Sequence, residues 1–172
     1  MTSSDPATIT AILLAGARPI ADPLATAAGV PVKPLVPVAG EPMINRPARA
    51  LLAHPAIGQL VVLTQNPEYF ADDPATAWLA SDPRVRFERG GKGIASSLLE
   101  LMEKADLPFP LLMTTADHVL LDAAMLDQFV AEATGADIAV ELHQFGEETL
   151  RPQHRIAPLA GHHRYRDQPS PV

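Results

Sequence analysis

Short apolar runs alternate along this chain with segments of helical periodicity. The apolar patterns predict strands at Thr8–Ala15, Leu60–Thr64, Arg84–Glu88, Leu111–Thr115 and Asp137–Leu142. The helical patterns predict helices over Met43–Ala53, Pro74–Ala80 and Ile94–Lys104, and a last one from its N-cap Asp122 to Ala133. Strands and helices that alternate in this way predict an α/β fold of three layers, a mostly parallel sheet with helices on both faces.

The segment Gly16–Pro42 interrupts the alternation. Six prolines lie within it, and proline at that density excludes a continuous helix or a central strand. Its apolar residues, among them Val32 and Leu35, can anchor it to the domain. Loops of this length in compact domains are usually functional or disordered, so we expect a long irregular loop of one of these two kinds.

The composition is that of a single globular domain. The chain has 172 residues, of which 47% are hydrophobic, and no apolar run approaches the roughly 20 residues of a bilayer span. No basic residue precedes an apolar segment at the N-terminus, and there is no cysteine. Disulfides, thiolate zinc sites and cysteine nucleophiles are therefore excluded, and we expect a cytoplasmic protein without a membrane partner.

The charge is unevenly distributed along the chain. Residues 1–148 carry nine basic and nineteen acidic side chains, whereas residues 149–172 carry four arginines and one aspartate. An acidic body argues against broad binding of nucleic acid but leaves room for a small phosphorylated ligand. We expect one domain over 1–148, and over 149–172 an irregular basic tail that is loosely packed or disordered.

The loop after the first predicted strand contains the first candidate residues. Ligands of open parallel sheets bind beyond the carboxyl ends of the strands. At Ala15-Gly16-Ala17-Arg18, Gly16 allows close approach of the backbone, and free amides together with Arg18 can meet phosphate oxygens. Further along, Lys33 stands beside a proline, and this stiff setting lowers the entropy lost in gripping a phosphate. The alternative for Lys33 is an ordinary solvated lysine.

A glycine-rich segment, Gly90-Gly91-Lys92-Gly93, opens the helix predicted from Ile94. Free amides and the positive end of the helix dipole favour an anion there, and Ser96 and Ser97 offer hydroxyl groups to a nucleotide. The segment lacks the spacing of a Walker P-loop. The alternative is a flexible turn with capping serines.

Asp117 lies at the end of the apolar strand Leu111–Thr115, in the closing segment Thr115-Ala116-Asp117-His118. A carboxylate at that place suits Mg²⁺, which takes one or two carboxylates together with phosphates of the substrate. The alternative for Asp117 is a cap on the next turn, and His118 is merely adjacent to it.

In chain order, these motifs resemble those of one family. LLAGARP and DPLATAAGVPVKPLVPVAGEPMI are similar to the signature of MobA-like nucleotidyltransferases, which has a Leu-Ala-Gly loop, a lysine near proline and Pro-Val-x-Gly-x-Pro-Met. GKGIASSL resembles the family's Gly-x-Ser helix start, and TTADH resembles its strand-end aspartate. The resemblance covers roughly residues 8–142, and the order of the motifs is more specific than any one of them.

The resemblance implies a Rossmann-like GT-A nucleotidyltransferase fold and transfer of a nucleotidyl group. A small phosphorylated or sugar acceptor, usually a phosphate or a phosphorylated sugar, would attack the α-phosphorus of a nucleoside triphosphate, and pyrophosphate would leave. The residues that carry over are Arg18 and Lys33 as the catalytic set, Ala15, Gly16, Gly93, Ser96 and Ser97 as the nucleotide-binding set, and Asp117 as the ligand of the Mg²⁺ cofactor.

The sequence also departs from the family pattern. Gly16-Ala17-Arg18 replaces a Gly-Gly-x-Gly run, and Val119 stands where many relatives have proline. Relatives continue with further strands and a second acidic metal ligand, which the tail does not resemble, so we expect the C-terminal part of the fold to be incomplete. Two alternatives follow: a catalytically incomplete domain that binds a nucleotide or a protein partner, and a homodimer formed through an exposed sheet edge.

Overall fold

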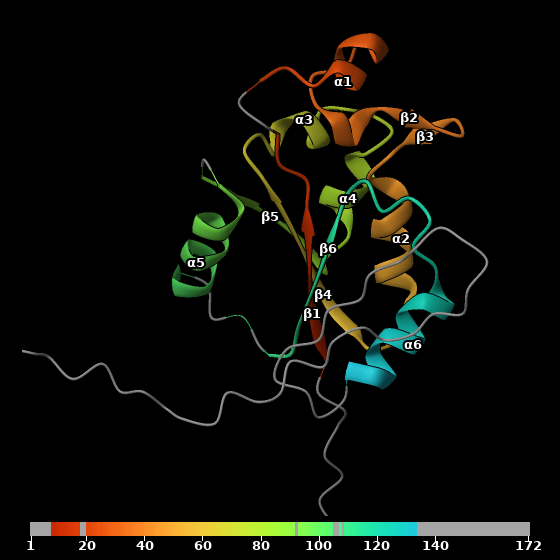
Figure 1. Cartoon of the computed structure of the whole chain (residues 1–172), viewed down its shortest axis with the longest axis vertical. Helices are drawn as coiled ribbons and strands as arrows, with labels where there is room; N and C mark the ends of the chain where they lie inside the picture. Colours follow the sequence, from red (N-terminus) through yellow and green to blue (C-terminus); the bar gives the residue numbers. More distant parts are fainter. Residues whose placement is uncertain (1–7, 18–19, 92, 105–106, 108, 134–172) are drawn as a thin grey trace, which may run out of the picture. The chain divides into compact units, whose positions relative to one another are not determined.

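The computed structural model describes residues 8–17, 20–91, 93–104, 107 and 109–133 (Figure 1). The chain divides into two compact units, Met1–Leu126 and Asp127–Val172. The described elements are β1 (Ile9–Leu14), α1 (Pro23–Ala28), the 3₁₀ turn η1 (Lys33–Leu35), β2 (Pro37–Val38), β3 (Glu41–Pro42), α2 (Asn45–Ala53), β4 (Ile57–Thr64), α3 (Glu68–Ala71), α4 (Ala77–Ser81), β5 (Val85–Arg89), α5 (Ile94–Lys104), β6 (Leu111–Thr115) and α6 (Ala123–Ala133). The sheets and the site described below lie in the first unit.

The main sheet has the strand order β5-β4-β1-β6, and all of its neighbouring strands are parallel. Ile12 of β1 lies beside Val61 of β4 on one side and Met113 of β6 on the other. This arrangement confirms the predicted α/β fold with a mostly parallel sheet. The strand predicted at Arg84–Glu88 is β5, which lies at an edge of the sheet as its alternating sequence indicates.

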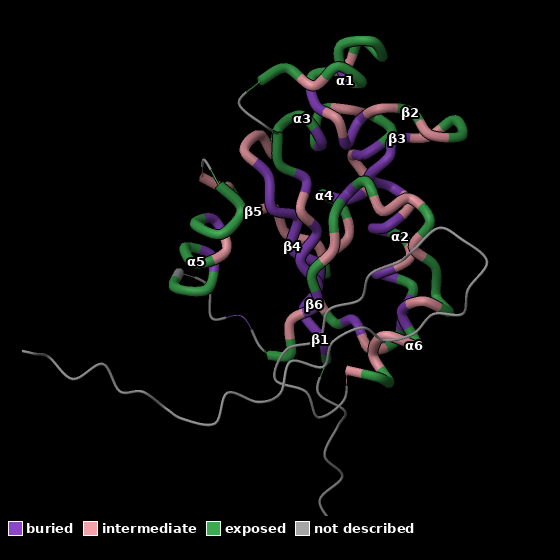
Figure 2. The backbone as a smooth tube through the Cα atoms, viewed as in Figure 1, coloured by how far each residue is buried: buried purple, intermediate pink, exposed green. Residues whose placement is uncertain are grey.

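Helices cover both faces of this sheet (Figure 1). On one face, Ile12, Val61 and Leu63 pack against Leu101 of α5 in a buried cluster. On the other face α2 contacts β1 and β4, and its Leu51 is fully buried. Figure 2 shows that the central strands β1 and β4 are largely buried. Burial of each such large apolar side chain contributes about 1.5–3 kcal/mol to the stability of the folded domain. The contacts on both faces therefore hold the sheet between the two helical layers.

The segment Gly16–Pro42 is more regular than its prolines suggest, because it contains α1, η1 and the two-stranded sheet β2–β3. Pro23 stands at the first helical position, where no backbone N–H is needed. The Oδ1 of Asp22 accepts hydrogen bonds from the amides of Leu24 and Ala25 at 2.9 and 3.2 Å. Proline therefore begins α1 here instead of preventing it, and Gly29, with φ 67°, ends it.

Several other predictions agree with the structure in detail. α5 and β6 have the predicted bounds, and Pro47 falls in the first turn of α2. Asp122 caps α6, since its Oδ1 accepts a hydrogen bond from the Met125 amide at 2.9 Å. The strand predicted at Asp137–Leu142 and the tail 149–172 lie outside the described residues, so both stay predictions, as does the domain boundary at 148. None of the described helices has the length and apolar character that a bilayer span requires.

Candidate functional site

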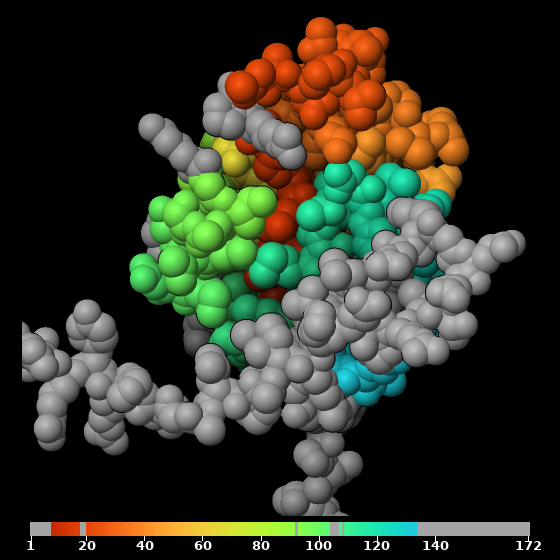
Figure 3. All heavy atoms as spheres, in the orientation of Figure 1, coloured from red at the N-terminus to blue at the C-terminus, as the bar shows by residue number. Residues whose placement is uncertain are grey.

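A cleft of about 490 Å³ lies beyond the carboxyl ends of the parallel strands. Its walls come from the loop after β1, from η1, from the residue after β4, from the glycine segment after β5 and from the residues after β6; its lining includes Gly16, Lys33, Gln65, Gly93 and Asp117. In Figure 3 the red atoms of β1 and its loop lie in a hollow between the green atoms of α5 and the teal atoms of β6 and the residues after it. The structure therefore has an opening where open parallel sheets bind ligands.

Two charged residues of the cleft form an ion pair. The Nζ of Lys33 lies 2.6 Å from Oδ2 of Asp117, and the Thr115 hydroxyl donates to Oδ1 of Asp117 at 2.5 Å. The hydrogen bond from Lys33, and after it that from Thr115, lower the pKa of Asp117 below its ordinary value of 3.8. The side chains of Lys33 and Asp117 are 35% and 48% exposed, so both remain within reach of a ligand.

The glycine segment is organised by Ser97, which is buried at the start of α5. Its Oγ accepts a hydrogen bond from the Gly91 amide at 2.7 Å and donates to the Gly93 carbonyl at 2.6 Å. Ser96 also donates to the Gly93 carbonyl, at 3.1 Å, and does not line the cleft. The Ser97 hydroxyl thus holds the shape of the glycine segment, and a direct contact with a nucleoside stays a prediction.

The loop after β1 is held by hydrogen bonds to β4 and to the residue that follows it. The Ala15 amide donates to the Leu63 carbonyl at 2.9 Å, and Ala15 is buried outside the lining of the cleft. The Ala17 amide donates to Oε1 of Gln65 at 2.7 Å. Two of the amides expected to meet phosphate are therefore engaged within the protein. Arg18, the other predicted phosphate ligand, lies outside the described residues.

Gln65 is a cleft residue that the sequence analysis did not identify. It follows the apolar strand β4 directly, whereas Asp117 is the second residue after β6, and both residues line the cleft. A polar residue just after a buried parallel strand is the signal that could have identified Gln65. That signal was used for Asp117 because a carboxylate suggests a metal, whereas an amide suggests no particular ligand.

The carboxylates of the described part of the chain do not form a metal cage. Among these residues no group of three or more histidine, cysteine, aspartate or glutamate side chains could hold a metal ion. Two carboxylates of the described residues line the cleft: that of Asp22, whose Oδ1 caps α1, and that of Asp117, which lies beside the Thr115 hydroxyl. Mg²⁺ often takes one or two carboxylates and completes its shell with water and phosphates of the substrate. This donor set fits an ion that a phosphorylated ligand shares.

Of the residues predicted for the site, the structure brings five to one cleft: Gly16, Lys33, Gly93, Ser97 and Asp117. Ala15 and Ser96 lie next to these residues in the chain but do not line the cleft. The structure thus gathers most of the predicted site, while the role of each residue stays a prediction.

A model of the MobA-like NTP transferase domain matches residues 11–168. No curated protein matches the chain. The family match extends over most of the chain and agrees with the order of motifs noted in the sequence.

Solved structures with the same fold include 4-diphosphocytidyl-2C-methyl-D-erythritol synthase from Anaerococcus prevotii, with 12% identity over 81% of this chain and a TM-score of 0.57. CMP:2-keto-3-deoxy-manno-octonic acid synthetase in complex with CTP has 16% identity over 73% and a TM-score of 0.54. A hypothetical transferase from Thermus thermophilus has 25% identity over 75% and a TM-score of 0.54. The chain spans 60%, 47% and 48% of the length of these three proteins.

The ion pair predicts a pH dependence at Asp117. Because the pKa of Asp117 is lowered in the folded protein, the pair contributes stability above pH 3.8, and this contribution is lost as the pH falls through the lowered value. We expect the pKa of Asp117, measured from its carboxyl carbon resonance, to rise in Lys33→Met and to rise less in Thr115→Val. The pKa of Asp82, which Arg84 lowers, serves as the control and should not change. An Asp117 pKa that is the same with and without Lys33 would contradict the pairing.

Proposed function

The chain belongs to the family of MobA-like NTP transferase domains, and on that premise we propose that it is a nucleotidyltransferase. In this proposal the NMP group of a nucleoside triphosphate passes to a small phosphorylated or sugar acceptor, and pyrophosphate leaves. The observation that carries the proposal is the contact of Lys33 with Asp117 inside the cleft, because it brings a cation suited to phosphate and a carboxylate suited to a metal to one point. The CTP bound to a protein of the same fold supports a nucleotide as the ligand.

Asp117 would hold Mg²⁺ in this site, since its half-exposed carboxylate needs only water and phosphate oxygens to complete the coordination. When bound, the ion would neutralise charge on the triphosphate and on the departing pyrophosphate. The Thr115 hydroxyl would keep Asp117 oriented through its bond to Oδ1.

The remaining residues would position the triphosphate. Lys33 would exchange its bond with Asp117 for a bond with a phosphate oxygen, and Gly16 would let the backbone approach closely because it has no side chain. The acceptor oxygen forms a bond to the α-phosphorus as the bond to the bridging β-phosphate oxygen breaks, and an acceptor hydroxyl would lose its proton to solvent. Such chemistry depends on positioning and on electrostatic stabilisation.

Binding of the nucleotide can be tested by thermal shift with each of the four nucleoside triphosphates, with and without Mg²⁺. We expect a rise in melting temperature that requires Mg²⁺ and disappears in Asp117→Ala. Lys33→Ala should weaken the affinity about tenfold, because it removes a charge-assisted hydrogen bond. Asp72→Ala, at an exposed aspartate that does not line the cleft, is the matched control. A stabilisation that Asp117→Ala leaves unaltered would rule out the metal assignment.

Turnover distinguishes the enzyme from its alternative, a catalytically incomplete domain that binds a nucleotide or a protein. We expect pyrophosphate release when the preferred triphosphate is screened with Mg²⁺ against sugar phosphates and small phosphorylated alcohols. Release should depend on the acceptor and should be lost in Asp117→Ala. Binding of the triphosphate without release for any acceptor would favour the incomplete domain.

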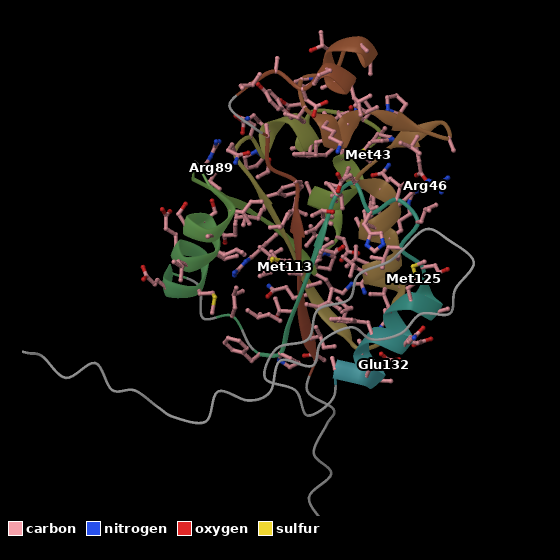
Figure 4. All side chains as sticks on the ribbon, viewed as in Figure 1. Met43, Arg46, Arg89, Met113, Met125 and Glu132 are labelled. Atoms are coloured by element: carbon pink, nitrogen blue, oxygen red, sulfur yellow. The ribbon has the colours of Figure 1, made fainter. Side chains whose placement is uncertain are left out.

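The homodimer belongs to the proposal as well, and the two edge strands of the sheet, as far as the described residues form it, support this part. Edge strand β5 contains charged residues, among them Arg86 and Glu88, whereas edge strand β6 contains none. Charged residues in an edge strand discourage pairing with another chain. Met113 of β6 is 48% exposed on the side of the sheet where α5 lies (Figure 4). We expect sedimentation to show a dimer that Met113→Lys weakens; a monomer at high concentration would exclude it.

A cytoplasmic location and the absence of nucleic-acid binding stay predictions.

A further inference from the structure

Gln65 connects the two walls of the cleft that come from different strands. Its Oε1 accepts the hydrogen bond from the Ala17 amide in the loop after β1, and its Nε2 donates to the Gly91 carbonyl at 3.2 Å. One side-chain amide thus holds both backbone segments at once. Ala17 and Gly91 are far apart in the sequence, but they lie on either side of Gln65 because β1 and β5 flank β4 in the sheet.

Gln65 is itself held in place from the neighbouring strand. Arg89 lies at the end of β5 (Figure 4). Its Nη1 donates to the Gln65 carbonyl at 2.7 Å, and its Nη2 donates to Glu68 at 2.9 Å. Gly91 is fixed from its other side, because its amide donates to the Ser97 hydroxyl. The backbone groups of Gln65 and Gly91 are therefore both held by hydrogen bonds. Because of this, the side-chain amide of Gln65 has little freedom to move.

Gly16 fits closely against the same amide. A Cβ added at Gly16 would lie 3.1 Å from both Nε2 and Oε1 of Gln65, closer than side chains normally approach. The amide would then have to shift, and its hydrogen bonds to Ala17 and Gly91 would weaken. The absence of a side chain at residue 16 and the glutamine at residue 65 are thus matched to each other.

We propose that Gln65 is a positioning residue that sets the distance between the loop after β1 and the glycine segment before the nucleotide binds. The proposal rests on the proposed function in that the ligand between these walls is taken to be a nucleoside triphosphate. Walls that are held at the right spacing in the free protein bind more tightly, because less conformational entropy is lost on binding. Gln65 acts through the two walls and takes no part in the chemical step.

The first test compares Gln65→Leu with Gln59→Leu, which changes a glutamine within β4 that does not line the cleft. We expect Gln65→Leu to raise the KM for the Mg²⁺-bound triphosphate about fivefold, the effect of one or two neutral hydrogen bonds, and to leave kcat nearly unchanged. Gln59→Leu should change neither constant. A Gln65→Leu protein with an unchanged KM and a reduced kcat would overturn the proposal. That result is expected when the substitution only reduces the fraction of folded protein.

A double-mutant cycle tests the match with Gly16. Gly16→Ala should weaken triphosphate binding in the wild-type background, and the same change should have much less effect when Gln65→Ala has already removed the amide. Equal effects of Gly16→Ala in the two backgrounds would show that the two residues act independently, which contradicts the proposal.

Amide hydrogen exchange separates a failure of this inference from a failure of the proposed function, because it needs no nucleotide. Exchange at Ala17 should be faster in Gln65→Leu than in the wild type, and it should stay slow in Gln65→Glu, whose carboxylate still accepts the bond. Protection of Ala17 that does not depend on residue 65 would overturn the inference. If the free protein shows the expected exchange but no triphosphate binds, the connection between the walls stands and the nucleotide assignment fails. Gln65→Ala, which also removes the acceptor, replaces Gln65→Leu if that protein does not fold, and Ala17 exchange as slow as in the wild type would again overturn the inference.

Discussion

Four strands that run parallel bring every residue that follows a strand to the same edge of the sheet, and the cleft depends on this constraint. Gly16, Gln65, Gly90 and Asp117 follow β1, β4, β5 and β6, and all four line the cleft. Antiparallel pairing of any of these strands would move its last residues to the opposite edge. The apolar clusters on both faces maintain the alignment, so the core of the domain determines where the polar residues meet.

The polar groups at this edge bind mainly to one another. Lys33 pairs with Asp117, Ser97 bridges the Gly91 amide and the Gly93 carbonyl, and Gln65 joins two loops. A buried or half-buried polar group without a partner would cost about 1–3 kcal/mol, so these bonds stabilise the free protein. They also divide the site into a rigid frame of amides and hydroxyl groups and one exposed ion pair that can change partners.

The sequence predicts the fold better than it predicts the site. The bounds of α5 and β6 could be predicted to the residue. A stripe of apolar residues at helical spacing indicates a helix, and a short continuous apolar run indicates a buried strand. Pro23 was harder to interpret, since the same residue prevents a helix in its middle and favours one at its start.

Within the site, chemistry identified residues that periodicity could not place. Lys33 and Asp117 were recognised as a cation and a carboxylate suited to phosphate and metal, but their contact joins positions 84 residues apart and needs the folded sheet. The direction of a hydroxyl is not encoded in a motif, and Ser97 turns toward its own glycine segment. Gln65 was overlooked because its importance comes from the two backbone segments beside it.

The ion pair of Lys33 with Asp117 has a consequence for the order in which ligands arrive under the proposed function. A free divalent cation that approached Asp117 would have to displace an ammonium group and leave it beside a second positive charge. A cation that arrives already chelated by a triphosphate comes as a complex whose net charge is still negative, and the ammonium group gains a new partner as it loses the old one. The empty protein would therefore discriminate against bare metal ions and admit metal and nucleotide together.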